Sequence, residues 1–317
     1  MLSRLSHTYR HLQSVFRMRS GALARTLQTS EHRAMLMFHS ILPKHDSQLH
    51  LRNSTIEELR TIIRFLQKTG AFVSVKQYID EPEPHQYAIT FDDGLYNNLR
   101  YAAPVLGELN IPASYYINTP WIHGESTIWT EELSFWTKHH NKPLRIGKSQ
   151  YHKQAHNRWL NIETGQTLMS DLLLLKKEDA ASRLEEIRKQ TGSVDLPIEF
   201  RNLKGEEIRL LSEIPFTTIG SHGIDHHAMT LLSEDSLKDT LVTSKKYLQE
   251  CTATAIDEIA FPFGMFNEAV YVASSLAGYE YMIGVEKNER FSDVAHRFGF
   301  YNHLSLPQQL GALSSYQ

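Results

Sequence analysis

Two adjacent carboxylates, Asp92 and Asp93, follow an apolar run in the segment YAITFDDG at residues 87–94. The apolar run predicts a buried strand, and α/β barrel enzymes place catalytic groups where such strands end. Successive strand residues point in opposite directions, so both carboxylates reach one cavity only if the chain bends, and Gly94 permits that bend. A pair of aspartates that begins the next helix as N-caps is the structural alternative.

Three histidines and one aspartate lie within six residues in IGSHGIDHHAM at 219–229, again after an apolar run. His222 and His226 are four residues apart, a spacing at which two imidazoles on a helical turn face one metal ion. Asp225 and His227 complete the cluster, which is difficult to explain as core filling. Surface histidines without a ligand are the alternative, but the pattern favours a metal site.

One carboxylate and two imidazoles leave coordination positions open on a metal ion. Such an ion can activate water and polarise a substrate carbonyl, which is hydrolytic rather than structural chemistry. With Asp93, His222 and His226 as the ligands, Asp92 is free to act as the general base if it lies within hydrogen-bond reach of the water.

A third motif, AFPFGMFN at 260–267, ends an apolar run with Pro262 and Gly264. These residues predict a turn that terminates a strand. The turn would free the backbone N–H of Phe263 to stabilise the oxyanion of a tetrahedral intermediate. By itself this motif is a weak signal.

The elements that carry these motifs alternate between strands and helices. Apolar runs predict strands, and three segments with helical spacing or capping signals predict helices. The predicted strands are residues 34–39, 72–75, 87–93, 113–119, 216–222, 258–263 and 281–285, and the predicted helices are residues 55–70, 101–109 and 233–250. The first helix has Ser54 and Glu57 as its capping box and ends at Gly70, and the third has Ser233 as its N-cap. This alternation predicts a parallel sheet covered by helices, and about seven strands favour an α/β fold of the distorted (β/α) barrel type.

Residues 124–215 are too long and too polar for a normal connection between a strand and a helix. We therefore expect a helical insertion here, with two helices within residues 170–192. Trp121, Trp129 and Trp136 gather near its start. They are expected either to pack the insertion onto the barrel or to form a wall on which sugar rings stack, with Tyr96 as a further candidate for substrate contact.

The composition describes an ordinary globular protein, with 41% hydrophobic residues, 22% charged residues and a net charge of −3. This charge makes nucleic acid an unfavourable partner. The single cysteine, Cys251, excludes an intramolecular disulfide and a thiolate metal cluster. Residues 1–31 are interpreted as an N-terminal helical extension before a domain at 32–310. Their arginines interrupt any signal-like apolar run, and no transmembrane segment is expected, so a cytoplasmic location is the prediction. A presequence or a membrane-surface helix is the alternative.

Together, TFDDG, the His222/His226 pair and AFPFG resemble, in identity and order, the polysaccharide deacetylase (NodB-like) family of carbohydrate esterases. The resemblance extends to MLMFHSILP at 35–43, AAPVLGELNIPASYYINT at 102–119 and SSLAGYEYMIGV at 274–285. It covers about residues 34–302. The resemblance implies a distorted (β/α) barrel, Asp92 as the catalytic base, and Asp93, His222 and His226 as ligands of a divalent metal ion, for which zinc is expected.

Two departures from the family pattern concern residues that assist Asp92. Many members carry an arginine directly before the proline-aromatic-glycine turn. This chain has EIAFPFG there and lacks the arginine, and Arg297 in HRFGF at 296–300 is the proposed replacement. The family's late histidine, a general acid, has only a poor counterpart in HLSL at 303–306. His39, at the end of the first predicted strand, is the alternative acid because a histidine there would titrate near neutral pH.

The expected function is removal of the N-acetyl group from an amino sugar in polysaccharide or glycoconjugate biosynthesis. The sugar is expected to be linked to a nucleotide or a lipid. An amidase or deacylase that acts on a non-sugar linear amide is one alternative. An inactive, carbohydrate-binding relative is the other, favoured by the missing arginine and disfavoured by the complete set of aspartates and histidines.

Overall fold

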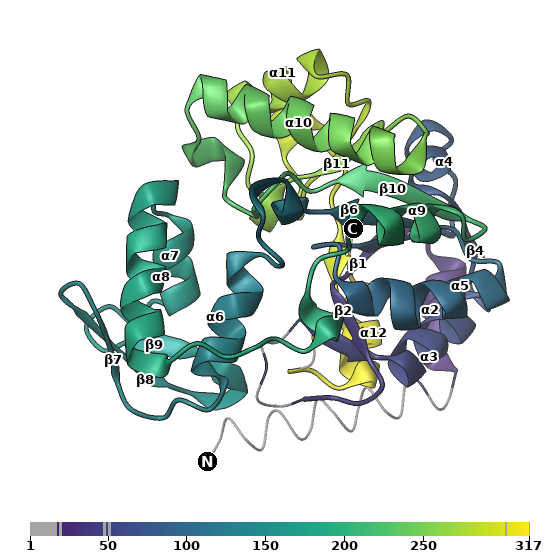
Figure 1. Ribbon diagram of the computed structural model, residues 1–317. Coiled ribbons are helices and arrows are strands. Elements are labelled where there is room, and N and C mark those ends of the chain that lie inside the picture. Colours follow the sequence, from purple (N-terminus) through teal and green to yellow (C-terminus); the bar gives the residue numbers. More distant parts are fainter. Residues whose placement is uncertain (1–17, 19–20, 47–48, 50–51, 302, 317) are drawn as a thin grey trace.

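The computed structural model describes residues 18, 21–46, 49, 52–301 and 303–316 (Figure 1). They form a curled sheet covered by helices and a lobe inserted beside it. Most of the predicted N-terminal extension, residues 1–17 and 19–20, lies outside the described residues. Its described part forms α2 (Ala22–Thr29), whose Leu23 and Leu27 are buried in the main core.

Seven parallel strands form the path through the main sheet in the described part of the chain, in the order β12-β11-β10-β6-β5-β1-β13. In chain order they are β1 (Ala34–Phe38), β5 (Gln86–Phe91), β6 (Ala113–Ile117), β10 (Thr217–Ser221), β11 (Glu258–Ala260), β12 (Tyr281–Ile283) and β13 (Phe298–Gly299). Off this path, β4 (Ala71–Phe72) pairs with the start of β5. A short parallel pair, β2 (Ser40–Leu42) and β3 (Asn53–Thr55), lies beyond the end of β1.

The segment before β13 brings the two edges of this sheet together. Ala295 donates its N–H to Met282 O (2.9 Å) and accepts from Gly284 N (2.8 Å), so the segment pairs with β12. β13 itself pairs with β1. The sheet therefore curls into the distorted barrel that the sequence predicts.

Helices cover the outside of the curled sheet (Figure 1). They are α3 (Ile56–Leu66), α4 (Val75–Asp80), a π-helical turn at Asn98–Ala102 that continues into α5 (Ala103–Leu109), α9 (Gly205–Ser212), α10 (Glu234–Thr252), α11 (Glu268–Leu276) and α12 (Leu306–Leu313). Ser233 is the N-cap of α10, as predicted.

The boundaries of α3 differ from the prediction. Its capping box is Thr55 with Glu58, not Ser54 with Glu57, because Ser54 is paired with Ile41 in the β2–β3 ladder. The helix ends at Leu66, before Gly70. A Cβ at Gly70 would lie 2.0 Å from His85 O, so this glycine is required by the close approach of two chain segments.

The insertion forms a lobe with its own hydrophobic core, which includes Trp129 and Trp136 (Figure 1). Its elements are α6 (Trp129–Lys138), an antiparallel sheet of β7 (Leu144–Ile146), β8 (Ser149–Lys153) and β9 (Trp159–Asn161), α7 (Leu168–Leu173), and α8 (Lys177–Thr191). The structure differs from the expected helical insertion at about 124–215 in two respects. The lobe contains this sheet, and α9 buries Ile208 and Leu211 in the main core instead of belonging to the lobe.

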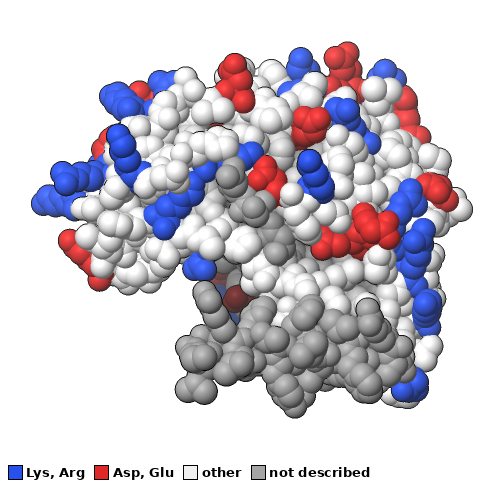
Figure 2. All heavy atoms as spheres, turned by 90° about the horizontal axis from the view of Figure 1, so that it is seen from below, with Lys and Arg blue, Asp and Glu red and all other residues white. Residues whose placement is uncertain are grey.

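The surface carries charges of both signs. In the view of Figure 2, basic side chains predominate at the end of the molecule formed by the insertion, whereas the remaining surface mixes acids and bases. None of the described helices is both long enough and apolar enough to cross a membrane.

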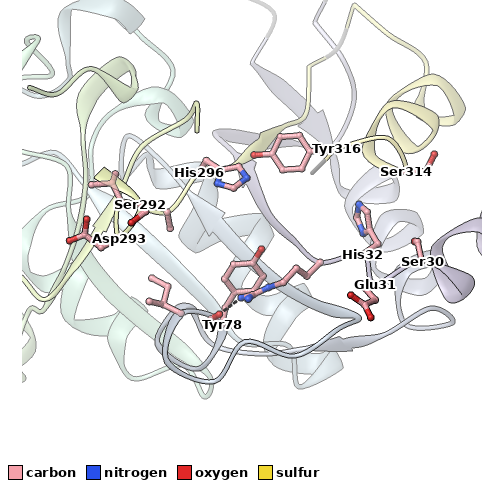
Figure 3. Close-up of a pocket in the computed structure, with 13 residues that line it drawn as sticks. Ser30, Glu31, His32, Tyr78, Ser292, Asp293, His296, Ser314 and Tyr316 are labelled. Carbon is pink, nitrogen blue, oxygen red and sulfur yellow. Dashed lines mark hydrogen bonds between the residues drawn. The ribbon is translucent and has the colours of Figure 1, made fainter. Parts of the chain in front are cut away.

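A cavity of about 580 Å³ lies at the amino end of the sheet, next to the residues that precede β1 and β13 (Figure 3). His296 and Tyr316 lie on one side of it and Tyr78 on the other. Arg33, which also lines it, places its guanidinium carbon 3.8 Å from the centroid of the Tyr78 ring.

Candidate metal centre

Asp92 and Asp93 lie directly after β5, at the carboxyl end of the sheet, and both are buried. The bend predicted at Gly94 begins one residue earlier, because Asp93 (φ 73°) and Gly94 (φ 68°) both have left-handed backbone conformations. A Cβ at Gly94 would lie 2.7 Å from a methyl carbon of Ile117, which leaves room only for glycine. The Asn202 side chain donates a hydrogen bond to the Asp93 carbonyl and holds the bend in place. Both carboxylates thus reach one cavity.

The predicted triad of Asp93, His222 and His226 comes together, with one ligand atom of each residue within 4.8 Å of the others. Asp93 Oδ1 lies 3.1 Å from His226 Nε2 and 3.7 Å from His222 Nε2. Burial alone would raise the pKa of Asp93, but the imidazoles that face it outweigh this effect and hold the pKa well below its usual value. The aspartate is therefore ionised at neutral pH, as a metal ligand must be.

The hydrogen bonds around the triad fit a metal ion. Neither carboxylate oxygen of Asp93 has a hydrogen-bond partner among the described residues, although both are buried. His222 Nδ1 lies 2.7 Å from Ala260 O, so it carries the hydrogen, and Nε2 directs a lone pair at Asp93. Burial lowers the pKa of His222 to about 4 and keeps the ring neutral. Two buried orphan oxygens and an oriented imidazole lone pair are the donor set expected of a divalent-cation site.

Arg297 contacts Asp92 through two parallel hydrogen bonds, of 2.6 Å from Nη1 to Oδ1 and 2.8 Å from Nη2 to Oδ2. The guanidinium is only 2% exposed, and its Nε donates to Gly284 O. Burial alone would raise the pKa of Asp92, but the charge of the Arg297 guanidinium lowers it overall. The arginine missing before the AFPFG turn is thus supplied, as the sequence suggested, by the segment that closes the barrel.

Phe263 lies in a tight turn beside the triad and has a left-handed backbone conformation (φ 59°). Its ring packs edge-on against His226, with centroids 4.4 Å apart. None of the backbone hydrogen bonds recorded for the described residues uses the Phe263 N–H, whereas Gly264 and Met265 donate theirs to Phe261 O and Pro262 O. The turn frees this N–H, as the motif predicts.

Three residues other than glycine in or beside the triad have left-handed backbone conformations. Asp93, His226 and Phe263 each have one, at a cost of about 1–3 kcal/mol per residue. Contacts with neighbouring residues stabilise these conformations. For example, Trp129 Nε1 donates a hydrogen bond to His226 O (3.0 Å). Strain maintained at three residues around one cavity is characteristic of a functional site.

His39 lies near the two aspartates and is buried. Burial and the charge of Arg52 lower its pKa to about 3, so its ring is neutral at pH 7. The expectation that it titrates near neutral pH does not agree with this environment. His303, its rival, is exposed and contacts the ring of Tyr301.

Of the aromatic candidates for substrate contact, only Trp129 lies beside the triad, with its ring centroid 6.1 Å from that of Phe263. Trp121 donates its indole N–H to Asn202 O (3.0 Å), and Tyr96 lies under the guanidinium of Arg201 at 4.7 Å. Neither lines the cavity next to Phe263. Both rings instead pack the segment that leads from the insertion back to the barrel, and their contact with substrate stays a prediction.

Three contacts of this site were not found from the sequence. Thr90 accepts a hydrogen bond from Arg297 Nη1 (3.2 Å). It precedes Asp92 by two positions, and the alternation of side chains along a strand was a signal for it. Asn202 and Asn118, which hold the backbone of Asp93 and His222, follow no local pattern that would reveal them.

Residues 181–282 match the family described as polysaccharide deacetylase. This region includes both histidines of the triad and the AFPFG turn, and the TFDDG motif precedes it. A comparison with curated proteins finds no match. The family match supports a hydrolase of the polysaccharide deacetylase type, which acts on amide bonds.

Solved structures of deacetylases share the fold. The Streptococcus pyogenes deacetylase PplD, solved in complex with acetate, is 13% identical, with a TM-score of 0.55 over 88% of this chain and 97% of that one. BC0361, a polysaccharide deacetylase from Bacillus cereus, is 14% identical, with a TM-score of 0.55 over 89% of this chain and 68% of that one. IcaB from Ammonifex degensii is 14% identical, with a TM-score of 0.54 over 90% of this chain and 98% of that one. The resemblance to the polysaccharide deacetylase family that the motifs predict is therefore confirmed, by the family match over residues 181–282 and by the fold over most of the chain.

Proposed function

We propose that this protein is a metal-dependent hydrolase that removes the N-acetyl group from an amino sugar in polysaccharide or glycoconjugate biosynthesis. The observation that carries the proposal is the buried triad of Asp93, His222 and His226 beside an aspartate held by an arginine. The products of the reaction are acetate and a free amine.

Asp93, His222 and His226 would hold the ion through one carboxylate oxygen and two imidazole Nε2 atoms. When bound, a divalent ion supplies Lewis acidity, which polarises the amide carbonyl and lowers the pKa of water. Zinc suits a ligand set of two nitrogens and one oxygen. The neutral imidazole of His222 and the ionised carboxylate of Asp93 are in the protonation states that such an ion requires.

Asp92 is the proposed base. Its Oδ2 lies 4.0 Å from His222 Nε2, so it borders the triad without belonging to it. In this role it accepts the proton of the water that attacks the carbonyl carbon. Arg297 keeps the carboxylate ionised and fixes both of its oxygens, and we therefore assign it a positioning role.

Phe263 is the proposed oxyanion donor. Its free N–H belongs to a residue whose ring contacts His226, so the donor lies on the rim of the triad. A backbone N–H held by a strained turn needs no rearrangement when charge develops on the carbonyl oxygen.

Acetate release from N-acetyl sugars in free, nucleotide-linked and lipid-linked form, with and without chelator, tests this proposal. We expect release that chelator abolishes and added metal restores. Asp92→Asn is expected to lower kcat by about 100- to 10,000-fold, the range for loss of a general base, while metal content is unchanged. Release of amine from non-sugar amides alone would favour a general amidase. An Asp92→Asn variant as active as the native protein would overturn the mechanism.

The general acid is tested separately, by the kinetics of His39→Gln and His303→Gln. We retain His39 as the proposed acid because of its position near both aspartates. A neutral His39 must first gain a proton, and the proton that Asp92 accepts from water is the proposed source. A selective loss of activity in His303→Gln, with His39→Gln unaffected, would reverse this assignment.

The cytoplasmic location and the carrier of the sugar remain predictions. Cell fractionation tests the first, and the substrate panel tests the second.

A further inference from the structure

A second cavity, of about 280 Å³, lies next to the metal centre between the insertion and the barrel. The barrel contributes Arg52, Phe263 and Tyr301, and the insertion contributes most of the remaining wall. The Phe263 ring that packs on His226 also lines this cavity. The cavity therefore begins where the triad ends.

Electrostatic effects agree with this placement. Burial raises the pKa of Tyr301, and the charge of Asp92 raises it further. The charge of Arg52 is among the influences that lower the pKa of Asp93. Two residues of the cavity wall therefore lie within electrostatic range of the two aspartates.

The wall that the insertion supplies is largely apolar. Its apolar surface comes from Leu133 of α6, Trp159 of β9, and Leu168 and Met169 of α7. A sugar ring would need hydrogen-bonding groups here, because burying a hydroxyl without a partner costs several kcal/mol.

Three polar residues of this wall, Thr137, Asn157 and Thr167, form hydrogen bonds with the protein itself. Thr137 Oγ1 donates to Leu133 O (2.7 Å), and Thr167 Oγ1 accepts from Ser170 N (3.0 Å). The Asn157 amide donates to Ser134 O and Thr137 Oγ1. What the cavity offers to a ligand is chiefly hydrocarbon surface.

The loop that closes this cavity is held in a costly conformation. His156 and Asn157 both have positive φ angles, of 56° and 52°, and the Asn157 hydrogen bonds fasten the loop to α6. Arg158, the next residue, is exposed at the edge of the cavity. A cation therefore lies at the edge of an apolar wall.

We propose that this cavity binds a hydrocarbon chain of the substrate, so that the protein acts on an amphiphilic acetylated or acylated sugar. The inference rests on the proposed hydrolase function and specifies its substrate class. The chain can belong either to a lipid phosphate that carries the sugar or to the acyl group that is removed. The position of Arg158 suits an anionic group at the edge of the cavity.

Two substrate series distinguish these sources. The first compares N-acetylglucosamine 1-phosphate with its farnesyl and decyl phosphodiesters. The second lengthens the N-acyl group of glucosamine from acetyl to octanoyl. We expect kcat/KM to rise in one series, roughly fourfold for each methylene that becomes buried. A rise in the first series identifies a carrier lipid, and a rise in the second identifies a longer acyl group. A flat response in both series overturns the proposal.

Variants of Met169 link the response to this cavity. Met169→Trp fills it and Met169→Ser makes it polar, and both are expected to abolish the chain-length effect while activity on N-acetylglucosamine 1-phosphate is retained. Leu174→Ser is the matched control, because this residue of the same lobe is 62% exposed and does not line the cavity. A chain-length effect that persists in both Met169 variants overturns the assignment to this cavity.

Calorimetric binding of decyl phosphate provides a readout without catalysis. We expect binding to the native protein that Met169→Trp weakens at least tenfold and Arg158→Gln weakens less. Binding that depends on Met169 in a protein that hydrolyses no amide would support the cavity and disprove the proposed function. Activity on soluble sugars without decyl phosphate binding would support the proposed function and overturn the proposed role of the cavity.

Discussion

The two ends of the parallel sheet each hold polar side chains, but they use them differently. At the carboxyl end, the buried carboxylate of Asp93 has no hydrogen-bond partner among the described residues and faces the imidazoles of His222 and His226. At the amino end, the buried carboxyl of Glu258 accepts a hydrogen bond from Tyr116 (2.9 Å), and His32 bonds the carbonyl of Leu313. The Asp93 carboxylate can therefore take a ligand, whereas the Glu258 carboxyl and the His32 ring connect distant segments of the chain.

This difference follows from the construction of a parallel barrel. The connections that leave the carboxyl ends of the strands supply side chains for chemistry, whereas the opposite face serves mainly stability. Both ends carry a cavity, and the amino-end cavity is the larger of the two described here (Figure 3). Size alone therefore does not locate the chemistry, and the following substitutions test the division between the two ends.

The largest effect is expected from His226→Ala. Loss of one imidazole from the triad should release the metal ion and lower activity by about a hundredfold or more, because the ion supplies several kcal/mol of transition-state stabilisation. Metal content per protein and acetate release are the measurements.

His227→Ala is its matched control, because the adjacent ring stacks near Trp129 and lies outside the triad. Equal loss of metal from both variants would argue against the triad.

A smaller effect is expected from Arg297→Lys. Lysine keeps the positive charge but cannot make the two parallel hydrogen bonds to Asp92. We expect kcat to fall by about 10- to 100-fold, the usual range for a residue that orients an active group, with KM and metal content nearly unchanged.

Arg290→Lys, which alters an exposed pair with Glu268, should leave all of these parameters unchanged. A variant of Arg297 that lost its metal together with its activity would assign the arginine to the structure of the whole site.

At the amino end, Glu258→Gln should change stability and leave chemistry intact. Burial raises the pKa of Glu258 from 4.5 to about 7. Between these values the folded protein binds the proton and the unfolded chain does not, so this residue's contribution falls as pH rises from 4.5 through 7. Removing the charge should make the variant more stable than the native protein above pH 7, by an amount on the order of 3 kcal/mol at most.

Denaturant unfolding of both proteins from pH 5 to pH 8 is the measurement. The stability difference should grow with pH across this window. A constant difference would mean that Glu258 does not retain its proton in the folded state.

The smallest effect is expected from Tyr316→Phe in the amino-end cavity. The buried Tyr316 hydroxyl has no hydrogen-bond partner among the described residues. Its removal should leave kcat/KM within about twofold and the thermal midpoint unchanged or slightly higher, because an unsatisfied buried hydroxyl is unfavourable. A loss of activity of tenfold or more would show that the amino end takes part in the chemistry after all.

Much of the fold could be read from local sequence patterns. Six of the seven apolar runs that predict strands overlap strands of the main path, and Ser233 was identified as a cap from its neighbours alone. The run at 72–75 overlaps only β4, which lies off that path, and β13 was not predicted. Errors occurred where distant contacts override the local pattern. Ser54 does not cap α3, because it pairs with Ile41 between β2 and β3. The polar strands β7 to β9 form a sheet within a segment that was expected to be helical.

The sequence by itself identified the residues of the candidate metal centre, because Asp92, Asp93, His222 and His226 follow strands whose apolar character is local. Only the tertiary structure decided how these residues are assisted. Arg297 reaches Asp92 across 205 positions of the chain, and the apolar cavity combines residues of the barrel with residues of the insertion. The end of a strand can be predicted from its local sequence. A residue that contacts the site only because the barrel closes or the insertion packs against it cannot be predicted from a local pattern.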